Sequence, residues 1–380
     1  MPKRPVHYAL LGLLAVALWH LLVIAGHSWN PTSLFFAGDK YPPPPHLATQ
    51  VYQYPNTPGF DGQFYLYIAH DPWNHQDYAR YVDNPAMRYR RILFPALAWT
   101  LSFGQPTWPT YSYIVVMWLA ASLGVYLLAD LCLVWGLPTA LGMAFLLIPA
   151  TIVSFDRMMT DVGIPLALVA LLWAVERKQS TCAFVALMLV PLARETGLAL
   201  VGAWVLWQAF RRQWRAAAMG AVAAVPTVLW AVWVHQHFGS DQVAWWGWPF
   251  EGILTRLSTY FLYPAPHLGF QVALFLEYLG ALGILIAFVW VIWLHARGER
   301  SLALLFGLLY TIGISLFAKE DMWGEAYSYV RTGGPTAVAL ALWGLQHRRW
   351  STTIPMLLAL PRIGLQLAWV FINALQHLLE

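Results

Sequence analysis

The stretch "HYALLGLLAVALWHLLVIAG" (residues 7–26) decides the class of fold, because it contains no Asp, Glu, Lys or Arg. A membrane-spanning helix needs about 17–25 mostly apolar residues. Four more stretches satisfy this requirement clearly, at 111–131, 215–235, 269–294 and 301–318. Shorter or interrupted candidates follow at 138–154, 161–175, 181–209, 333–346 and 352–376. The sequence therefore predicts an all-α integral membrane protein, with residues 1–380 forming a single multi-spanning domain.

The first apolar stretch has a second interpretation as a secretory signal peptide. "MPKR" (1–4) precedes an apolar core from Tyr8 to Ile24, which is the order of a signal sequence. However, "AGHSWNP" (25–31) contains no clean small-x-small cleavage pattern. We therefore expect this segment to be retained as the first spanning helix.

The composition supports a membrane protein and argues against nucleic-acid binding. Hydrophobic residues make up 59% of the chain and charged residues only 11%, whereas soluble proteins carry about 25% charged residues. The formal net charge of +4 comes from small basic groups beside apolar runs, with no basic domain. This pattern is typical of membrane topology signals.

The basic groups predict how the chain crosses the membrane. Lys and Arg near helix ends favour the cytoplasmic side, and here the groups are Lys3/Arg4, Arg177/Lys178, Arg211/Arg212/Arg215, Arg297/Arg300 and Arg348/Arg349. This placement requires 181–209 to cross twice, as a tight helical hairpin with Arg194 and Glu195 near its outer tip. We therefore expect about eleven crossings, with the N-terminus inside. The last segment, 352–376, either breaks at Pro361 or lies along the interface, and whether it spans fully stays open.

Three long segments are then predicted to lie outside the cytoplasm, at 27–110, 236–268 and 319–332. Long loops are usually functional or form small domains. Within the first, residues 85–103 begin cationic and end apolar, which predicts an amphipathic helix on the membrane surface whose arginines face headgroups or a bound phosphate. Short interfacial helices are thus expected in this long first loop.

One carboxylate in the first long segment stands out, within "GFDGQFYLYIAHDP" (59–72). Asp61 could cap a short helix that ends near His70, or it could act in catalysis, and one residue can do both. The following "HDPWNHQD" (70–77) contains two His and two Asp, but their spacing matches no compact metal signature. We therefore predict no cofactor, and a divalent metal stays the open alternative.

Other charges near the outer surface are candidates for binding an anion, since charge at membrane depth usually marks a functional site. Arginine binds phosphate in a planar, often bidentate way; the candidates are Arg88, Arg90, Arg91, Arg194 and Arg331. Asp156 and Asp161 are either caps of the helix at 161–175 or functional. "YVRTGGPT" (329–336) predicts a helix starting near Pro335, whose N-terminus with Arg331 could cradle a phosphate or could be an ordinary helix start.

These motifs together resemble the GT-C superfamily of membrane glycosyltransferases, most closely bacterial members that build cell-surface glycopolymers. The resemblance rests on "GFDGQFYLYIAHDP", "YRRILFPALAW" (89–99), "LARETGL" (192–198) and "YVRTGGP" (329–335). It implies a catalytic acid matched to Asp61, and a second acidic motif for which Asp156 is the nearest match. It also implies a polyprenyl-phosphate-sugar donor used on the non-cytoplasmic side of a bacterial plasma membrane.

The resulting prediction is an inverting sugar transfer to a hydroxyl of a cell-envelope glycan or glycolipid, with Asp61 as general base and the arginines stabilising the leaving phosphate. Glu195, Tyr65 and Tyr329 join Asp156 as candidates for a second acidic or acceptor site. The expected partners are the donor lipid, the acceptor and membrane lipids, and no nucleic acid. Two alternatives stay open: a transporter or flippase of lipid-linked glycans, and an O-antigen-type polymerase or ligase.

Overall fold

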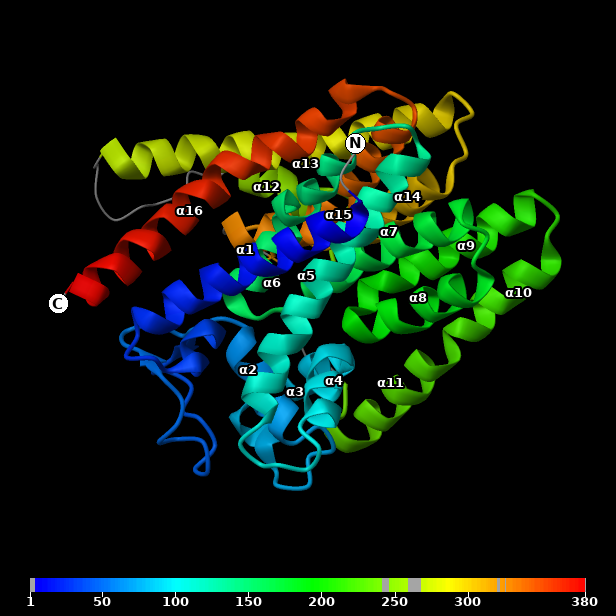
Figure 1. The fold of residues 1–380 in the computed structure, drawn as a ribbon. Coiled ribbons are helices and arrows are strands. Elements are labelled where there is room, and N and C mark those ends of the chain that lie inside the picture. The colour runs from blue at the N-terminus through cyan, green and yellow to red at the C-terminus, as the bar shows by residue number, and fades with distance from the viewer. Residues whose placement is uncertain (1–3, 241–245, 259–267, 320–321, 325, 380) are drawn as a thin grey trace.

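The computed structural model describes residues 4–240, 246–258, 268–319, 322–324 and 326–379. These residues are almost entirely helical, and a two-residue parallel pair, β1 (Ala37–Gly38) with β2 (Gln53–Tyr54), is their only sheet (Figure 1). The α-helices are α1 (Pro5–Ala25), α2 (Gly62–His70), α3 (Pro85–Arg88), α4 (Leu93–Leu101), α5 (Pro109–Val134), α6 (Pro149–Arg157), α7 (Gly163–Glu176), α8 (Ser180–Ala193), α9 (Leu198–Phe210), α10 (Trp214–Ala223), α11 (Val225–Phe238), α12 (Glu251–Ser258), α13 (Leu268–Ala296), α14 (Leu302–Ser315), α15 (Ala326–Gln346) and α16 (Ile354–Leu379).

Four helical stretches are long and apolar enough to cross a membrane: α1, α5, α13 and the stretch formed by α10 and α11. Two bent pairs raise the number to six if each pair is one span. One pair joins the 3-10 helix η4 (Thr139–Leu147) to α6 at 61°, and the other bends by 45° between Leu357 and Leu360. This confirms the predicted class of an all-α chain with membrane-spanning helices, whereas the count of eleven crossings stays a prediction.

The second bend answers one question that the sequence left open. The helix at the C-terminal end of the chain breaks immediately before Pro361, so Pro361 lies in the first turn of its second part. Proline is tolerated at that position because its missing N–H would have no partner there. The bend favours the first of the two alternatives, a break near Pro361, and whether the segment spans fully stays a prediction.

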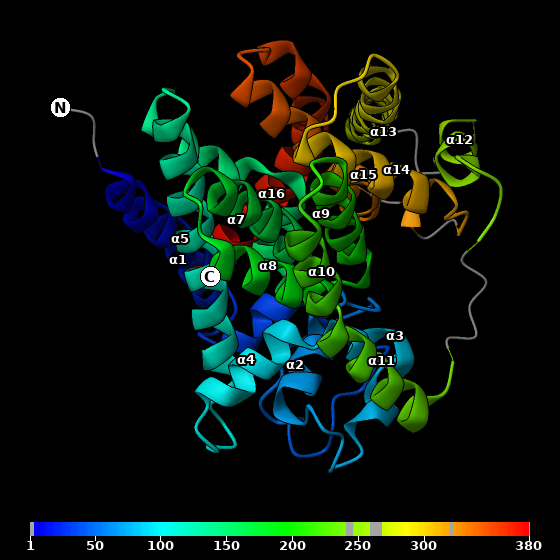
Figure 2. The ribbon, with the colours of Figure 1, turned by 90° about the vertical axis from the view of Figure 1, so that its right-hand side faces the viewer.

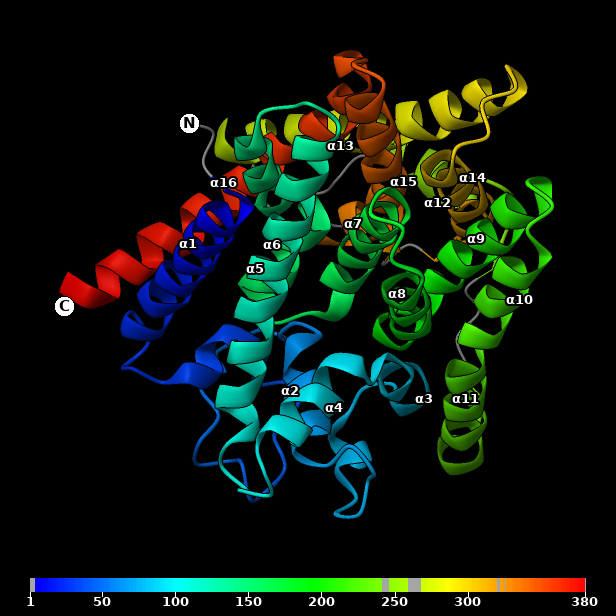
Figure 3. The same ribbon diagram turned by 45° about the vertical axis from the view of Figure 1, so that its right-hand side comes forward.

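Residues 27–110 fold as a compact unit at one end of the molecule. Figures 1 and 3 show α2, α3 and α4 at this end, and the N-terminus at the other. The expected single helix over 85–103 is divided into α3, the 3-10 helix η3 (Tyr89–Arg91) and α4. Only α4 shows the predicted apolar surface, with Leu97 and Trp99 exposed, whereas Arg88 and Arg91 are buried and point inward. The single amphipathic helix predicted for 85–103 is therefore wrong, and the placement of α4 on the membrane surface stays a prediction.

Gly62 fixes where this unit meets the long helices. A Cβ atom on Gly62 would collide with the backbone carbonyl oxygen of Arg157, the last residue of α6. The first turn of α2 can therefore approach α6 only because residue 62 lacks a side chain. This contact places Asp61, the residue before α2, at the junction between segment 27–110 and the helical bundle.

The helices α8 and α9 form the tight hairpin predicted for 181–209, with the 3-10 helix η6 (Glu195–Gly197) at its tip. The tip does not face solvent, because the Arg194 side chain is only 4% exposed. Figure 2 shows α8 and α9 within the bundle, beside α7 and α10. The hairpin therefore places the Arg194 side chain at its tip in the interior of the protein.

The predicted start of a helix near Pro335 is wrong. The helix α15 runs without interruption through Gly333, Gly334 and Pro335. Gly333 allows close packing, since a Cβ there would collide with the side chain of Ile284 on α13, and Thr336 makes a buried hydroxyl–hydroxyl hydrogen bond of 3.1 Å with Thr311 of α14. These contacts stabilise α15 around its proline, so Arg331 lies within α15 and the phosphate cradle predicted at a helix start near Pro335 does not form.

Candidate functional site

A polar chamber of about 810 Å³ lies where segment 27–110 meets α15 and the tip of the α8–α9 hairpin. This volume is within the usual range of about 300–1,000 Å³ for ligand sites. Six basic side chains line it against two acidic ones, namely Arg88, Arg91, Arg194, Arg256, Lys319 and Arg331 against Asp61 and Asp83. The wall therefore carries a surplus of positive charge suited to an anionic ligand.

Asp61 contacts two of these arginines at once. Its Oδ2 atom lies 2.7 Å from Nη1 of Arg88 and 2.6 Å from Nη2 of Arg331. Although Asp61 occupies the position before α2, its backbone is helical and its side chain makes no capping hydrogen bond. The interpretation of Asp61 as a helix cap is therefore wrong, and its carboxylate lies in the wall of the chamber, where it pairs with two arginines.

The two guanidinium groups also set the protonation state of Asp61. Burial alone would raise the pKa of this carboxyl, but Arg88 and then Arg331 outweigh burial and lower the pKa well below its usual range. Asp61 is therefore ionised, and with both arginines in place it is a weak base. Withdrawal of either guanidinium would raise the pKa and make the carboxylate a better proton acceptor.

Arg331 links Asp61 to a second buried carboxylate, Asp161. Its Nε atom donates a hydrogen bond of 3.1 Å to Asp161, which also pairs with Arg194 from the hairpin tip. Burial first, and then the neighbouring Arg91 and Arg331, lower the pKa of Arg194 to about 10. Asp161 thus lies between Arg194 and Arg331 and offsets the repulsion between these two cations. It does not cap the helix that follows it.

Two further ion pairs complete the chamber. Arg91 forms a bidentate pair with Glu195 at 2.9 and 2.7 Å and donates a hydrogen bond of 3.2 Å to the hydroxyl of Tyr65. Arg88 forms another bidentate pair with Asp83, at 2.9 and 2.8 Å. The structure therefore brings Glu195 and Tyr65 to the same arginine and adds Asp83, which sequence analysis did not single out.

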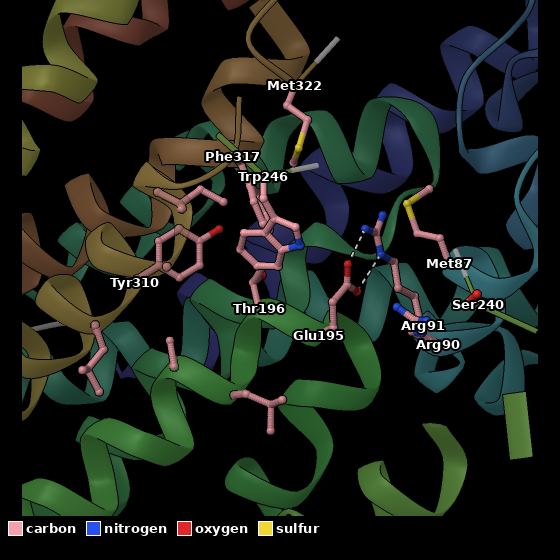
Figure 4. Close-up of a pocket in the computed structure, with 15 residues that line it drawn as sticks. Met87, Arg90, Arg91, Glu195, Thr196, Ser240, Trp246, Tyr310, Phe317 and Met322 are labelled. Carbon is pink, nitrogen blue, oxygen red and sulfur yellow. Dashed lines mark hydrogen bonds and ion pairs between the residues drawn. The ribbon is translucent and has the colours of Figure 1, made fainter. Parts of the chain in front are cut away.

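A second, more apolar cavity of about 570 Å³ adjoins the chamber (Figure 4). Met87, Arg91 and Met322 line both spaces, so the two are contiguous. The rest of its wall comes mainly from apolar side chains of α9 and α14, together with Trp246, Phe317 and Arg90. Leu198 at the start of α9 is 45% exposed, so the wall reaches the apolar outer surface of the bundle.

Three predicted site residues line neither cavity: Tyr65, Asp156 and Tyr329. Asp156 is buried and accepts hydrogen bonds from the indole of Trp19 and the hydroxyl of Tyr327, at 3.2 and 2.8 Å. Its neighbour Arg157 stacks on the ring of Phe36, 4.0 Å from the centroid. Tyr329 is buried against Gly280 of α13. Asp156 and Tyr329 are therefore buried in contacts between segments of the protein and line neither cavity.

Glu277 is another buried carboxylate, and it pairs with Arg256, which lines the chamber. Its two oxygens lie 3.2 Å from Arg256 of α12 and 3.0 Å from Arg362 of α16. Sequence analysis missed this connection, although Glu277 is a lone acid in the apolar stretch 269–294 and Arg362 a lone base in 352–376. Two single opposite charges within predicted spans are the signal that could have paired them.

The histidines and aspartates of residues 70–77 do not converge. Asp71 accepts hydrogen bonds of 2.8 Å from the backbone N–H groups of His75 and Gln76, and His70 bonds Thr110 at 3.2 Å. Among the residues that the structure describes, no group of three His, Cys, Asp or Glu side chains could hold a metal ion. Asp71 therefore has a structural role in the turn after α2.

No family model, curated protein or solved structure matches this chain. The resemblance to GT-C glycosyltransferases therefore rests on the four motifs, and any functional conclusion depends on the chemistry of the chamber.

Proposed function

We propose that this chain is a membrane glycosyltransferase that transfers a sugar from a polyprenyl-phosphate donor to a hydroxyl of a cell-envelope glycan or glycolipid. One observation carries the proposal: a chamber rich in arginine, with an ionised carboxylate in its wall, adjoins an apolar cavity. A lipid-linked phosphate has these two parts, an anionic head and an apolar tail. Arg91 lies on the boundary, where the head and the tail of such a donor would meet.

In the proposed reaction the acceptor oxygen attacks the anomeric carbon of the donor with inversion. The new C–O bond forms as the bond between the anomeric carbon and the phosphate oxygen breaks, and polyprenyl phosphate leaves with the bonding electrons. The acceptor proton passes to Asp61 and then to water. Arginines aimed at the leaving phosphate stabilise its growing charge, which is the largest contribution that such a site makes.

The resting ion pairs suggest how donor binding prepares Asp61 to act as a base. A phosphate that draws Arg88 or Arg331 toward itself takes from Asp61 the charge that depresses its pKa. The carboxylate then accepts a proton more readily once the donor is in place. Arg194 and Arg91, held by Asp161 and Glu195, can contact the same phosphate.

The proposed location follows from the chemistry of the donor. Polyprenyl-phosphate sugars are used on the non-cytoplasmic side, so the chamber would face outward from a bacterial plasma membrane. The eleven-crossing topology, with basic turns inside, puts segment 27–110 on that side. We propose this arrangement together with the function.

Sugar transfer by the purified protein tests the proposal. The protein would be incubated with short-chain polyprenyl-phosphate donors carrying labelled hexoses or pentoses and with envelope glycolipids as acceptors. We expect label in the glycolipid and release of polyprenyl phosphate, each greatly reduced in Asp61→Asn. Movement of intact donor across vesicles without cleavage would instead support a flippase, and absence of transfer from every donor would contradict the proposal.

A further inference from the structure

A separate cavity of about 420 Å³ lies within the N-terminal unit, at the far end of α2 from Asp61. Its wall is built from the end of α2 and three neighbouring stretches, 46–50, 76–78 and 99–109. None of its lining residues also lines the polar chamber or the apolar cavity. It is therefore a distinct space that the proposed reaction does not use.

The chemistry of this outer cavity differs from that of the chamber. No Asp, Glu, Lys or Arg lines it. Its polar groups are amides, imidazoles and hydroxyls, and the aromatic rings of Tyr78 and Trp99 complete the wall; the amides are Gln50, Gln76 and Gln105. The side chains of Gln76 and Gln105 have no hydrogen-bond partner among the described residues, so their donors and acceptors are available to a ligand.

His70, at the end of α2, adds no charge to the cavity near pH 7. Burial lowers the pKa of His70 to about 4, so its imidazole is neutral near pH 7. It is held in place by the hydrogen bond of 3.2 Å to Thr110. A phosphate or carboxylate would meet no Lys or Arg in this cavity, whereas an uncharged ligand with many hydroxyl groups would meet amide donors, amide acceptors and an aromatic face.

We propose that the outer cavity binds uncharged sugar residues of a glycan. Sugar hydroxyls would pair with the amides of Gln76 and Gln105, and the C–H face of a ring would pack against Trp99, which is 41% exposed. The volume falls within the usual range for ligand sites. The neutral lining selects glycan over the phosphate head of the donor, which the arginines of the chamber attract.

The position of the cavity gives it a role in acceptor recognition, and this part rests on the proposed function. Asp61 directly precedes α2 and His70 ends it, so the nine-residue helix separates the two sites by about 13 Å. Because residues 62–69 of α2 are buried, an acceptor glycan whose terminal hydroxyl reaches Asp61 would have to pass around α2, over the surface of the N-terminal unit, to reach the cavity. Sugars several positions behind the reacting one would then add affinity without touching the reaction centre.

Binding can be measured without any transfer reaction. The probes are neutral hexasaccharides of glucose, mannose, galactose and arabinose, titrated by calorimetry into the purified full-length protein. We expect at least one to bind, with affinity reduced about tenfold in Gln76→Ala and Trp99→Ala. The matched control is Trp29→Ala, an exposed tryptophan of the same unit that does not line the cavity, and it should bind normally.

Absence of binding by every probe, or binding undiminished in both variants, would overturn the proposal. Melting temperatures distinguish a lost site from a lost fold. Because Gln76 and Trp99 are exposed, their truncation should leave the fold intact.

The acceptor role of the cavity is tested by comparing the kinetics of transfer to long acceptors and to single-sugar acceptors. In Gln76→Ala, KM for long acceptors should rise about tenfold with kcat unchanged, since only uniform binding is lost. KM for a single-sugar acceptor should not change. Equal effects on long and short acceptors would contradict the acceptor role. If the wild-type protein transfers no sugar at all, the proposed function fails while the calorimetric result still decides whether the cavity binds glycan.

Discussion

Two clusters of charge in this protein are built in opposite ways, one of them with an exposed arginine and the other mostly buried. In the α5 cluster (Asp130, Trp173, Arg177), Asp130 accepts two hydrogen bonds from Arg177, at 2.8 and 2.7 Å, and one of 2.8 Å from Trp173. In the chamber cluster (Asp61, Arg88, Asp161, Arg194, Arg331), each carboxylate is shared between two arginines. One cluster is a single ion pair, and the other is a network in which Arg88 also pairs with Asp83 and Arg331 joins two carboxylates.

The different arrangement of the ion pairs indicates a different role for each cluster. A one-to-one bidentate pair joins α5 to the end of α7 and does not line any of the cavities described above. The chamber cluster instead lines a cavity, and its buried charges are costly because they lose hydration. Such a cluster is stabilised when an anion binds. The α5 cluster therefore holds the fold together, and the chamber cluster is arranged to hold a ligand.

We expect the two clusters to face opposite sides of the membrane, and thiol labelling in intact cells tests this. In a variant with the exposed Cys182 replaced by Ser, a cysteine at position 56 should react fully with a membrane-impermeant thiol reagent in intact cells. A cysteine at position 213 should not react until the cells are opened. Both positions are exposed on the protein surface, so access depends on the side alone. The reverse pattern would put the chamber in the cytoplasm.

Removing one carboxylate charge from each cluster should have very different effects on activity. Asp61→Asn should lower sugar transfer by about 10²–10⁴-fold, the usual contribution of a positioned base, with the protein still folded. Asp130→Asn should transfer sugar normally but melt at a lower temperature, since bonds to a charged group contribute about 1.5–3 kcal/mol. Equal activity of the two variants would show that Asp61 has only a structural role.

The same pair of variants should also differ in their affinity for phosphate. Asp61→Asn releases Arg88 and Arg331 from an ion pair, so pyrophosphate should bind several-fold more tightly than to the wild type. Asp130→Asn should leave this affinity unchanged. The measurement is calorimetric titration with sodium pyrophosphate at constant ionic strength. Weaker binding to Asp61→Asn would mean that the carboxylate organises the arginines and does not compete for them.

The acid stability of the chamber depends on its ion pairs. Burial raises the pKa of Glu195, but Arg91 outweighs it and lowers the pKa to about 2. Because the folded pKa lies below the unfolded value, this pair stabilises the protein fully above about pH 4.5 and progressively less as pH falls toward 2. Glu195→Gln should therefore show a smaller drop in melting temperature between pH 5 and pH 3 than the wild type. An unchanged drop would exclude this ion pair as a source of acid sensitivity.

Much of this arrangement was predictable from the sequence. The hairpin at 181–209 followed from two basic groups that had to lie on the same side. The convergence of Asp61 with Arg88, Arg91, Arg194 and Arg331 was expected from charge at membrane depth. Local signals and topology rules suffice for such features because they depend on hydrophobicity and charge along the chain.

The features that sequence analysis misjudged depend on contacts between distant segments. The helix α15 continues through Pro335 because packing against α13 and α14 outweighs the lost backbone bond. Asp161 stands at the predicted start of the helix at 161–175, yet its carboxylate pairs with two arginines, one from α15 and one from the hairpin tip. No local pattern reveals these partners, which are close only in the folded chain.

Equilibrium binding of farnesyl phosphate tests the central claim most directly, because this probe combines a phosphate head with a short prenyl tail. Its dissociation constant would be measured for the wild type, Arg331→Gln, Arg331→Lys and, as the matched control from the α5 cluster, Arg177→Gln. We predict at least tenfold weaker binding to Arg331→Gln, partial recovery in Arg331→Lys because Lys lacks the bidentate fork, and wild-type affinity in Arg177→Gln. Equal affinity of Arg331→Gln and Arg177→Gln would show that the chamber is not a phosphate site and would contradict the account.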